Sequence, residues 1–234
     1  MIDQSRARAS ILGRIRQSLK HRPADAAAAF RRLEAELLDP RPNLIPARAR
    51  LPVEGQRGLF LDMVRESAAS VSVIRAIDEV PDAIADYLKG ENLPASLRLA
   101  PDPAITGLSW SRRPLLRLSS GPTRGEDPVS VTGVFAAIAE TGTLVLISGP
   151  TSPTSLNFLP DTHIAVVPAG RLVGTMEEVF LRLRAANARA GASPGPRTVN
   201  FITGPSRSAD IEQKLQMGAH GPRRLHVIWV DDEA

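Results

Sequence analysis

The residues best suited to bind a ligand or take part in a reaction lie in a short polar segment in the second half of the sequence. Residues 138–143 are Ile-Ala-Glu-Thr-Gly-Thr, and an apolar run follows them directly. Gly142 permits a tight turn, and the hydroxyl groups of Thr141 and Thr143, with freed backbone amides, could hold a carboxylate or a phosphate. Glu140 is a candidate nucleophile or general base. A plain turn, in which the threonines satisfy backbone groups and Glu140 pairs with an arginine, is an equally good interpretation.

A second polar segment, Thr-Gly-Pro-Ser-Arg-Ser, occupies residues 203–208. We expect a strand to end there, a glycine to turn the chain, and a helix to run from Ser208 to Met217. A helix N-terminus beside serine hydroxyls is a ready site for an anion, and an arginine adds positive charge. The candidate anion ligands in this segment are Thr203, Gly204, Ser206 and Arg207. Ordinary capping by Ser206 or Ser208, with Asp210 in the first turn of the helix, is the more common explanation of such a pattern.

His220 is the histidine with the setting of an acid or a base. It lies in Gly-Ala-His-Gly-Pro at 218–222, a tight turn after the expected helix, and its unperturbed pKa of about 6.5 allows either role near neutrality. Gly221 beside it joins the candidate anion-binding residues. A histidine that hydrogen-bonds the last carbonyls of the helix is a competing interpretation of equal weight. His163 and His226 fall at or within expected strands, and we expect both to be structural.

Some kinds of site are excluded by residues that the sequence lacks. It contains no cysteine, so disulfides, thiol nucleophiles and thiolate-bound iron–sulfur clusters are excluded, and any redox centre must belong to another chain. The four histidines form no closely spaced pair, so we expect no metal site. The sequence has no dinucleotide-binding fingerprint, no phosphate loop ending in Gly-Lys-Ser/Thr and no nucleophile elbow. Nicotinamide and nucleotide chemistry therefore lack support.

The elements expected to position these segments alternate between helix and strand. Apolar residues at helical spacing predict helices at about residues 1–20, 24–38, 59–68, 81–88 and 176–190. Apolar and β-branched runs predict strands at 71–75, 96–100, 143–148, 163–167, 199–203 and 225–230. This alternation predicts a three-layer α/β fold, in which a largely parallel or mixed sheet carries helices on both faces. We expect residues 1–52 to form a helical arm with a proline-rich linker, and residues 53–234 to form the α/β domain.

The basic charge of the chain is concentrated near its N-terminus. Residues 1–50 hold eleven of the 29 lysines and arginines but only five of the 25 acidic residues, which leaves 18 basic against 20 acidic residues in the remainder. With one tyrosine, two tryptophans and six phenylalanines available for stacking, we expect no nucleic-acid groove. No segment approaches the roughly 18 apolar residues that a membrane helix needs, and no secretory signal is evident, so we expect a cytoplasmic protein.

The three polar segments together, in this order and spacing, resemble the LUD-domain family, which includes lactate utilization protein C and YkgG-like proteins. The family pattern is an Ala-Glu/Asp-Thr-Gly-Thr turn, a Leu-Pro stop, Thr-Gly-Pro-Ser with Ala-Asp-Ile-Glu, and Gly-x-His-Gly-Pro. The corresponding residues here are 139–143, 159–160, 203–206 with 209–212, and 218–222. The resemblance covers about residues 129–230, and the N-terminal helix is a weaker match.

This resemblance implies a fold similar to the NagB/RpiA/CoA transferase-like superfamily. It also implies a role in growth on L-lactate, in a complex that oxidises lactate to pyruvate with iron–sulfur partner proteins similar to LutA and LutB. The clusters are expected on those partners, and no cofactor is expected in this chain. Relatives usually carry an arginine a few residues before the Leu-Pro stop, where this sequence has Thr154. If that arginine binds substrate, Arg124 or Arg207 would have to replace it here, or binding here would be weaker.

Three functions are consistent with these observations. The first is a substrate-handling component of a lactate-oxidising system. The second is a free-standing isomerase-like or CoA-transferase-like enzyme that acts on a phosphate or thioester substrate with Glu140 as base or nucleophile; it rests on analogy between folds. The third is a noncatalytic scaffold that docks through its arginine-rich N-terminal helix. The sequence leaves open whether the chain is itself an enzyme.

Overall fold

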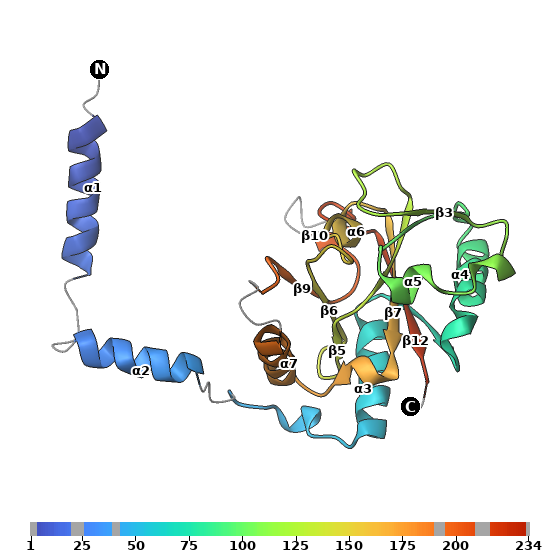
Figure 1. The fold of residues 1–234 in the computed structure, drawn as a ribbon, viewed down its shortest axis with the longest axis horizontal. Helices are drawn as coiled ribbons and strands as arrows, with labels where there is room; N and C mark the ends of the chain where they lie inside the picture. Colours follow the sequence, from blue (N-terminus) through green and yellow to red (C-terminus); the bar gives the residue numbers. More distant parts are fainter. Residues whose placement is uncertain (1–3, 20–25, 39–42, 190–194, 209–215, 233–234) are drawn as a thin grey trace. The chain divides into compact units, whose positions relative to one another are not determined.

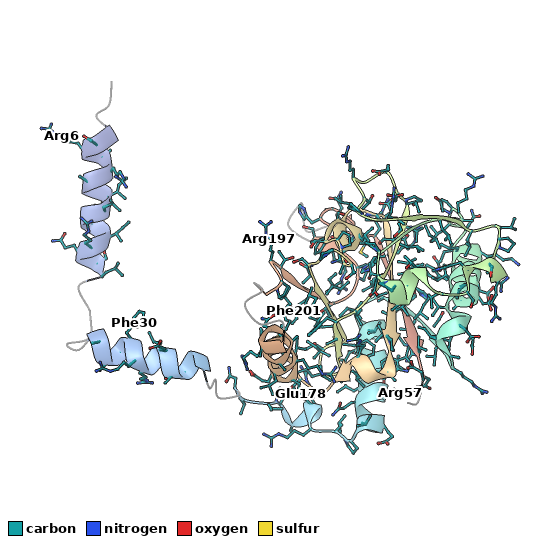
Figure 2. The ribbon with its side chains drawn as sticks, viewed as in Figure 1. Arg6, Phe30, Arg57, Glu178, Arg197 and Phe201 are labelled. Carbon is teal, nitrogen blue, oxygen red and sulfur yellow. The ribbon has the colours of Figure 1, made fainter. Side chains whose placement is uncertain are left out.

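The chain divides into two compact units, Met1–Leu44 and Ile45–Ala234 (Figure 1). The computed structural model describes residues 4–19, 26–38, 43–189, 195–208 and 216–232. In the first unit, α1 (Gln4–Ser18) and α2 (Ala26–Leu38) confirm the two helices predicted near the N-terminus. Their apolar side chains remain exposed, as Figure 2 shows for Phe30. Burial within this unit therefore does not explain why each helix carries apolar residues at helical spacing.

The second unit alternates strands with helices, as the apolar periodicity predicts. Its α-helices are α3 (Val53–Glu66), α4 (Val80–Gly90), α5 (Pro103–Thr106), α6 (Ser155–Phe158) and α7 (Met176–Arg189). Short 3₁₀ helices are η1 (Ala47–Ala49), η2 (Ile77–Glu79), η3 (Trp110–Arg112) and η4 (Ala169–Arg171). The helices predicted at 59–68, 81–88 and 176–190 are confirmed. The first of them begins earlier than expected, directly after Pro52, because a proline is tolerated at the start of a helix.

A six-stranded parallel sheet forms the centre of this unit. Its strands, in spatial order, are β1 (Ser70–Ile74), β12 (Arg224–Val230), β7 (Thr162–Pro168), β4 (Val129–Gly133), β2 (Ser96–Leu99) and β3 (Arg117–Ser120). Every neighbouring pair is parallel. The α/β fold with a largely parallel sheet is therefore confirmed, although the sequence analysis did not predict β3 and β4.

The two faces of this sheet pack against different partners. Alternate residues of β7 separate the two sides: Ala165 and Val167 join one core cluster, whereas Ile164 and Val166 join the other. The first cluster includes residues of α3, and the second includes residues of α4 and α5. Figure 1 shows α4 and α7 on opposite sides of the sheet. Both faces are thus covered, which explains why the central strands are nearly continuous in apolar residues.

A second, four-stranded sheet lies in the layer that also contains α3. Its order is β8 (Leu172–Val173), β5 (Ala136–Ile138), β6 (Thr143–Ile147) and β9 (Val199–Ile202). β6 pairs antiparallel with both β5 and β9, whereas β5 pairs parallel with β8. One side of this sheet faces the central sheet, and the other packs on α7 through Val179 and Leu183. The predicted strands at 143–148 and 199–203 therefore exist, but in a separate and mainly antiparallel sheet.

The helix predicted from Ser208 to Met217 is wrong at both ends. Residues 207–208 form β10 and residues 216–217 form β11, and these pair antiparallel as Arg207 with Met217 and Ser208 with Gln216. The intervening residues 209–215, including Asp210, lie outside the described part of the chain. Arg207 and Ser208 therefore belong to a strand, and the predicted helix does not begin at Ser208. No helix in the described residues is long and apolar enough to span a bilayer.

Candidate functional site

The glycine-centred turn joins β5 to β6 and packs tightly against α3. Ile138 pairs with Thr143 across the hairpin, so residues 139–142 make the turn. Gly142 has φ +63°, and a Cβ atom there would lie 2.6 Å from the backbone nitrogen of Val64 and 2.7 Å from the carbonyl carbon of Met63. Only glycine fits this conformation and this approach. The backbone of the turn thus rests on a helix instead of surrounding an open anion site.

The threonine hydroxyls near this turn are bonded to one another. The side-chain oxygens of Thr141 and Thr143 lie 2.7 Å apart, and those of Thr143 and Thr203 also lie 2.7 Å apart. The second contact arises because β6 and β9 are antiparallel, with Leu144 opposite Ile202. Thr143 is buried and occupies the centre of this chain of hydroxyls. This row of hydroxyl groups connects the glycine-centred turn with residues 203–208, which follow β9 and which we call the serine segment.

Glu140 points to the beginning of α7. Its side chain is buried, and its Oε1 accepts a hydrogen bond of 3.1 Å from the backbone N–H of Met176. Next to it, the Thr175 hydroxyl accepts from the N–H of Glu178 and donates to the carboxylate of Glu178. Glu178, labelled beside α7 in Figure 2, lies in the first turn of this helix. A carboxylate suits the positive end of a helix dipole, so Glu140 has a structural partner there.

A pocket of about 260 Å³ brings the serine segment and His220 together. We call it the serine–histidine pocket; its lining residues are Asn157, Phe158, 201–207 and 220–222. The Ser206 hydroxyl accepts a hydrogen bond of 3.2 Å from the backbone N–H of His220. The N–H of Ser206 donates to the carbonyl of Pro222 at 2.8 Å, and that of Gly218 donates to the carbonyl of Ser206 at 2.9 Å. Backbone hydrogen bonds therefore hold the two segments in register.

The predicted site residues divide into two groups. Those that line the serine–histidine pocket are Thr203, Gly204, Ser206, Arg207, His220 and Gly221. Glu140, Thr141, Gly142 and Thr143 do not line it, and Thr143 reaches it through its bond to Thr203. Glu140 bonds to the helix that follows β8, whereas Thr203 follows β9, and these strands are the two edges of the four-stranded sheet. The pocket and the Glu140 carboxylate are therefore separate places.

Asn157 is a residue of this pocket that the sequence analysis missed. It is 1% exposed, lies in α6, and its Oδ1 has no hydrogen-bond partner within the described residues. A buried amide oxygen without a partner is costly, and a bound ligand or water would satisfy it. An asparagine inside the apolar sequence Leu-Asn-Phe-Leu was the feature that could have identified it.

Two other histidines are buried in the central sheet. His163 Nε2 lies 2.8 Å from the Thr132 hydroxyl, and His226 Nδ1 lies 2.8 Å from the Ser70 hydroxyl. The ring of His226 also stacks on Tyr87 with centroids 3.8 Å apart. Burial lowers the pKa of each histidine to about 4, so both rings are neutral at pH 7. In the described residues no group of three His, Cys, Asp or Glu side chains could hold a metal ion.

Comparison with known proteins identifies the family of this region. Residues 128–230 match the sequence model of the LUD domain. Lactate utilization protein C from Halalkalibacterium halodurans is 42% identical over 106 residues, which are 44% of this chain and 44% of the relative. The protein of that name from Bacillus subtilis is 41% identical over 104 residues, which are 44% of this chain and 42% of the relative. The chain thus spans less than half the length of these curated relatives.

A solved structure extends the comparison to the fold. A DUF162 family protein from Deinococcus radiodurans superposes with a TM-score of 0.57 and 27% sequence identity, and the match covers 77% of this chain and 99% of that chain. The match therefore reaches well beyond residues 128–230, into the first half of the α/β unit. The resemblance inferred from the three polar motifs is confirmed: residues 128–230 match the LUD-domain family model and the corresponding part of the lactate utilization C proteins.

Proposed function

We propose that this chain is a component of a lactate utilization system and that it handles a small organic anion. One observation supports the proposal most directly. Residues 128–230, which match the LUD domain, include every residue that lines the serine–histidine pocket. The relatives named lactate utilization protein C supply the metabolic role. That role requires groups that recognise a ligand, and the pocket contains such groups.

The chemistry of the serine–histidine pocket suits a negatively charged group. Arg207 contributes positive charge, and the His220 ring and the Ser206 hydroxyl contribute hydrogen-bond donors. Gly204 has φ +73°, and a Cβ there would meet the backbone of Ser67, so the chain can turn at the pocket wall only with glycine. The unpartnered amide oxygen of Asn157 adds a buried acceptor for a hydroxyl or an amide of the ligand.

Oxidation of lactate needs an electron acceptor. Because the sequence has no cysteine, it cannot ligate an iron–sulfur cluster through thiolates. We therefore propose iron–sulfur partner proteins, similar to LutA and LutB, that accept the electrons in the cytoplasm. In this scheme the chain binds or presents the organic acid and the partners carry the redox chemistry.

The position of Glu140 favours this role over a free-standing isomerase or CoA transferase. A nucleophile or a base must reach its substrate, and the Glu140 carboxylate is buried and accepts the N–H of Met176. A scaffold that docks through α1 is a role for the first unit, and it is compatible with ligand handling by the second.

Growth experiments test the proposed function. Deletion of the gene should abolish growth of the source bacterium on L-lactate and leave growth on glucose unchanged. The wild-type gene and an Arg184→Gln control, altered on the exposed surface of α7, should restore growth on lactate. Genes carrying His220→Gln or Ser206→Ala should restore it poorly. Undiminished growth of the deletion strain on lactate, with no second copy of the gene, would contradict the proposal.

A further inference from the structure

A second cavity, separate from the serine–histidine pocket, lies at the carboxyl edge of the central sheet. Its volume is about 160 Å³. The residues that line it include Asp102, which follows β2, Gly133 and Val134 at the end of β4, and Arg171, which follows β7 in η4. β7, β4 and β2 are neighbours in the sheet. We call this space the switch-point cavity.

The topology of the sheet explains why a cavity forms there. From β2 the chain continues outward to the edge strand β3, whereas from β4 it continues in the opposite direction, to β7 and β12. Connections that leave two adjacent parallel strands in opposite directions open a crevice beyond the carboxyl ends of those strands. Ligands of open α/β sheets bind in this crevice. The cavity thus occupies the place where the fold favours a ligand.

The cavity offers one cation and one anion on different loops. The side chain of Arg171 has no hydrogen-bond or ion-pair partner among the described residues. Asp102 uses Oδ1 to accept the backbone N–H of Ala104 at 3.0 Å. Its Oδ2 lies 3.6 Å from the position that a Cβ of Gly133 would occupy, so the glycine leaves space beside this oxygen. A guanidinium binds a carboxylate well, and a carboxylate oxygen accepts a hydrogen bond from a hydroxyl.

The remaining wall limits the size and the polarity of the ligand. Val134 and Leu146 give it apolar surface, and Ser152 gives it a hydroxyl. The volume corresponds to roughly five water molecules in the liquid, which suits a small organic acid. A small molecule with a carboxylate, a hydroxyl group and a short alkyl part would match these groups.

We propose that the switch-point cavity binds a small 2-hydroxy carboxylate, with the carboxylate on Arg171 and the hydroxyl on Asp102. The choice of L-lactate as the probe rests on the proposed function, whereas the ligand class rests on the cavity. The serine–histidine pocket then binds another small organic anion, so the role proposed for that pocket still holds. The two sites are distinguishable because their residues lie in different loops.

Titration of the full-length ¹⁵N-labelled protein with L-lactate tests the proposal by NMR. The amide signals of Gly133 and Val134 should shift and saturate, while those of Gly204 and Gly221 stay in place. Propionate, which lacks the hydroxyl, should bind at least about tenfold more weakly, because one hydrogen bond to a charged acceptor is lost.

Two variants and one control assign the contacts. Arg171→Gln should weaken the binding of L-lactate at least about tenfold. Asp102→Asn should remove most of the preference for L-lactate over propionate, and its amide oxygen can still accept the N–H of Ala104. Arg117→Gln, on the exposed strand β3, should bind like the wild type. Thermal unfolding checks that each variant is folded.

Each outcome decides one claim. Saturable shifts at Gly133 that Arg171→Gln abolishes support the cavity, even if glycolate binds more tightly than L-lactate or the growth experiment fails. No shift with either acid, shifts confined to Gly204 and Gly221, or equal affinity in wild type and Arg171→Gln would overturn the cavity proposal. Those results would leave a growth defect on lactate, and hence the proposed function, standing.

Discussion

The side-chain oxygens of Thr143 and Thr203 lie 2.7 Å apart, although sixty residues separate them in the sequence. Thr143 begins β6 and Thr203 follows β9, so the antiparallel pairing of these strands creates the contact. Thr143 is also bonded to Thr141, which places a buried hydroxyl between two others. This chain of hydroxyls fixes the end of β9 and, through it, the wall of the serine–histidine pocket.

Thr143→Val should lower the free energy of unfolding by about 1 kcal/mol, because two hydrogen bonds to a buried hydroxyl are lost while the branched shape suits the strand. Urea unfolding followed by circular dichroism measures the change. Thr198→Val is the matched control: Thr198 is exposed and its bond to Thr154 is 3.3 Å long, so the change should stay within about 0.5 kcal/mol. Equal losses in the two variants would contradict the importance of the buried chain.

Gly142→Ala should lower the free energy of unfolding by about 2–5 kcal/mol. An alanine at φ +63° is strained, and its Cβ would collide with backbone atoms of Val64 and Met63, which cannot move aside as a flexible side chain would. Gly90→Ala is the control, since Gly90 lies in α4 with open space around it. There, at the last residue of the helix, the substitution should change the free energy of unfolding by less than about 1 kcal/mol. A neutral Gly142→Ala variant would show that the turn does not rest on α3.

Glu140→Ala should lower the free energy of unfolding by about 1–3 kcal/mol, because the Met176 N–H loses its acceptor at a part-buried helix start. Glu140→Gln keeps an oxygen acceptor and should lower it by less than about 1 kcal/mol. The same pair tests catalysis, since a general base or a nucleophile does not tolerate conversion to an amide. Growth on lactate that survives Glu140→Gln fits the structural role, and loss of growth with full stability would assign Glu140 to the chemistry.

The outcome for residues 203–218 shows where sequence reasoning fails and why. The serines and Asp210 have the pattern of a helix start, yet Arg207 pairs with Met217 and Ser208 with Gln216. The secondary-structure propensity of single residues does not describe this pairing, because it depends on contacts with residues farther along the chain, such as the hydrogen bond from Ser206 to Pro222. The turn at Gly142 was predictable, because a backbone position with a positive φ favours glycine, and the glycine is visible in the sequence.

The arrangement of the strands was only partly predictable, for a related reason. Runs such as Leu144–Leu146 and Ile164–Val167 are apolar on both faces, and such runs indicate burial without indicating direction. The first belongs to an antiparallel sheet and the second to the parallel one. Asn157 was missed because its significance comes from its burial beside a pocket, which only the folded chain defines.

The two buried histidines predict how stability depends on pH. Burial lowers the pKa of His163 and of His226 from 6.5 to about 4 in the folded protein, whereas both recover a value near 6.5 in the unfolded chain. Between these values the unfolded state binds more protons than the folded state, so stability rises with pH. The contribution is complete above about pH 6.5 and is lost as the pH falls to about 4. The slope approaches about 1.4 kcal/mol per pH unit for each histidine.

Urea unfolding at several pH values between about 4.5 and 7.5 measures this slope. His226→Gln loses the stack on Tyr87 and should be less stable at every pH, but the informative quantity is its slope, which should fall to about half. Thr198→Val is the control, because Thr198 is exposed and carries no titratable group, so the slope should stay unchanged. Carboxylates contribute equally to all three proteins, so they cancel in the comparison. A slope that His226→Gln leaves intact would mean that this imidazole is already charged, or exchanging with solvent, in the folded state.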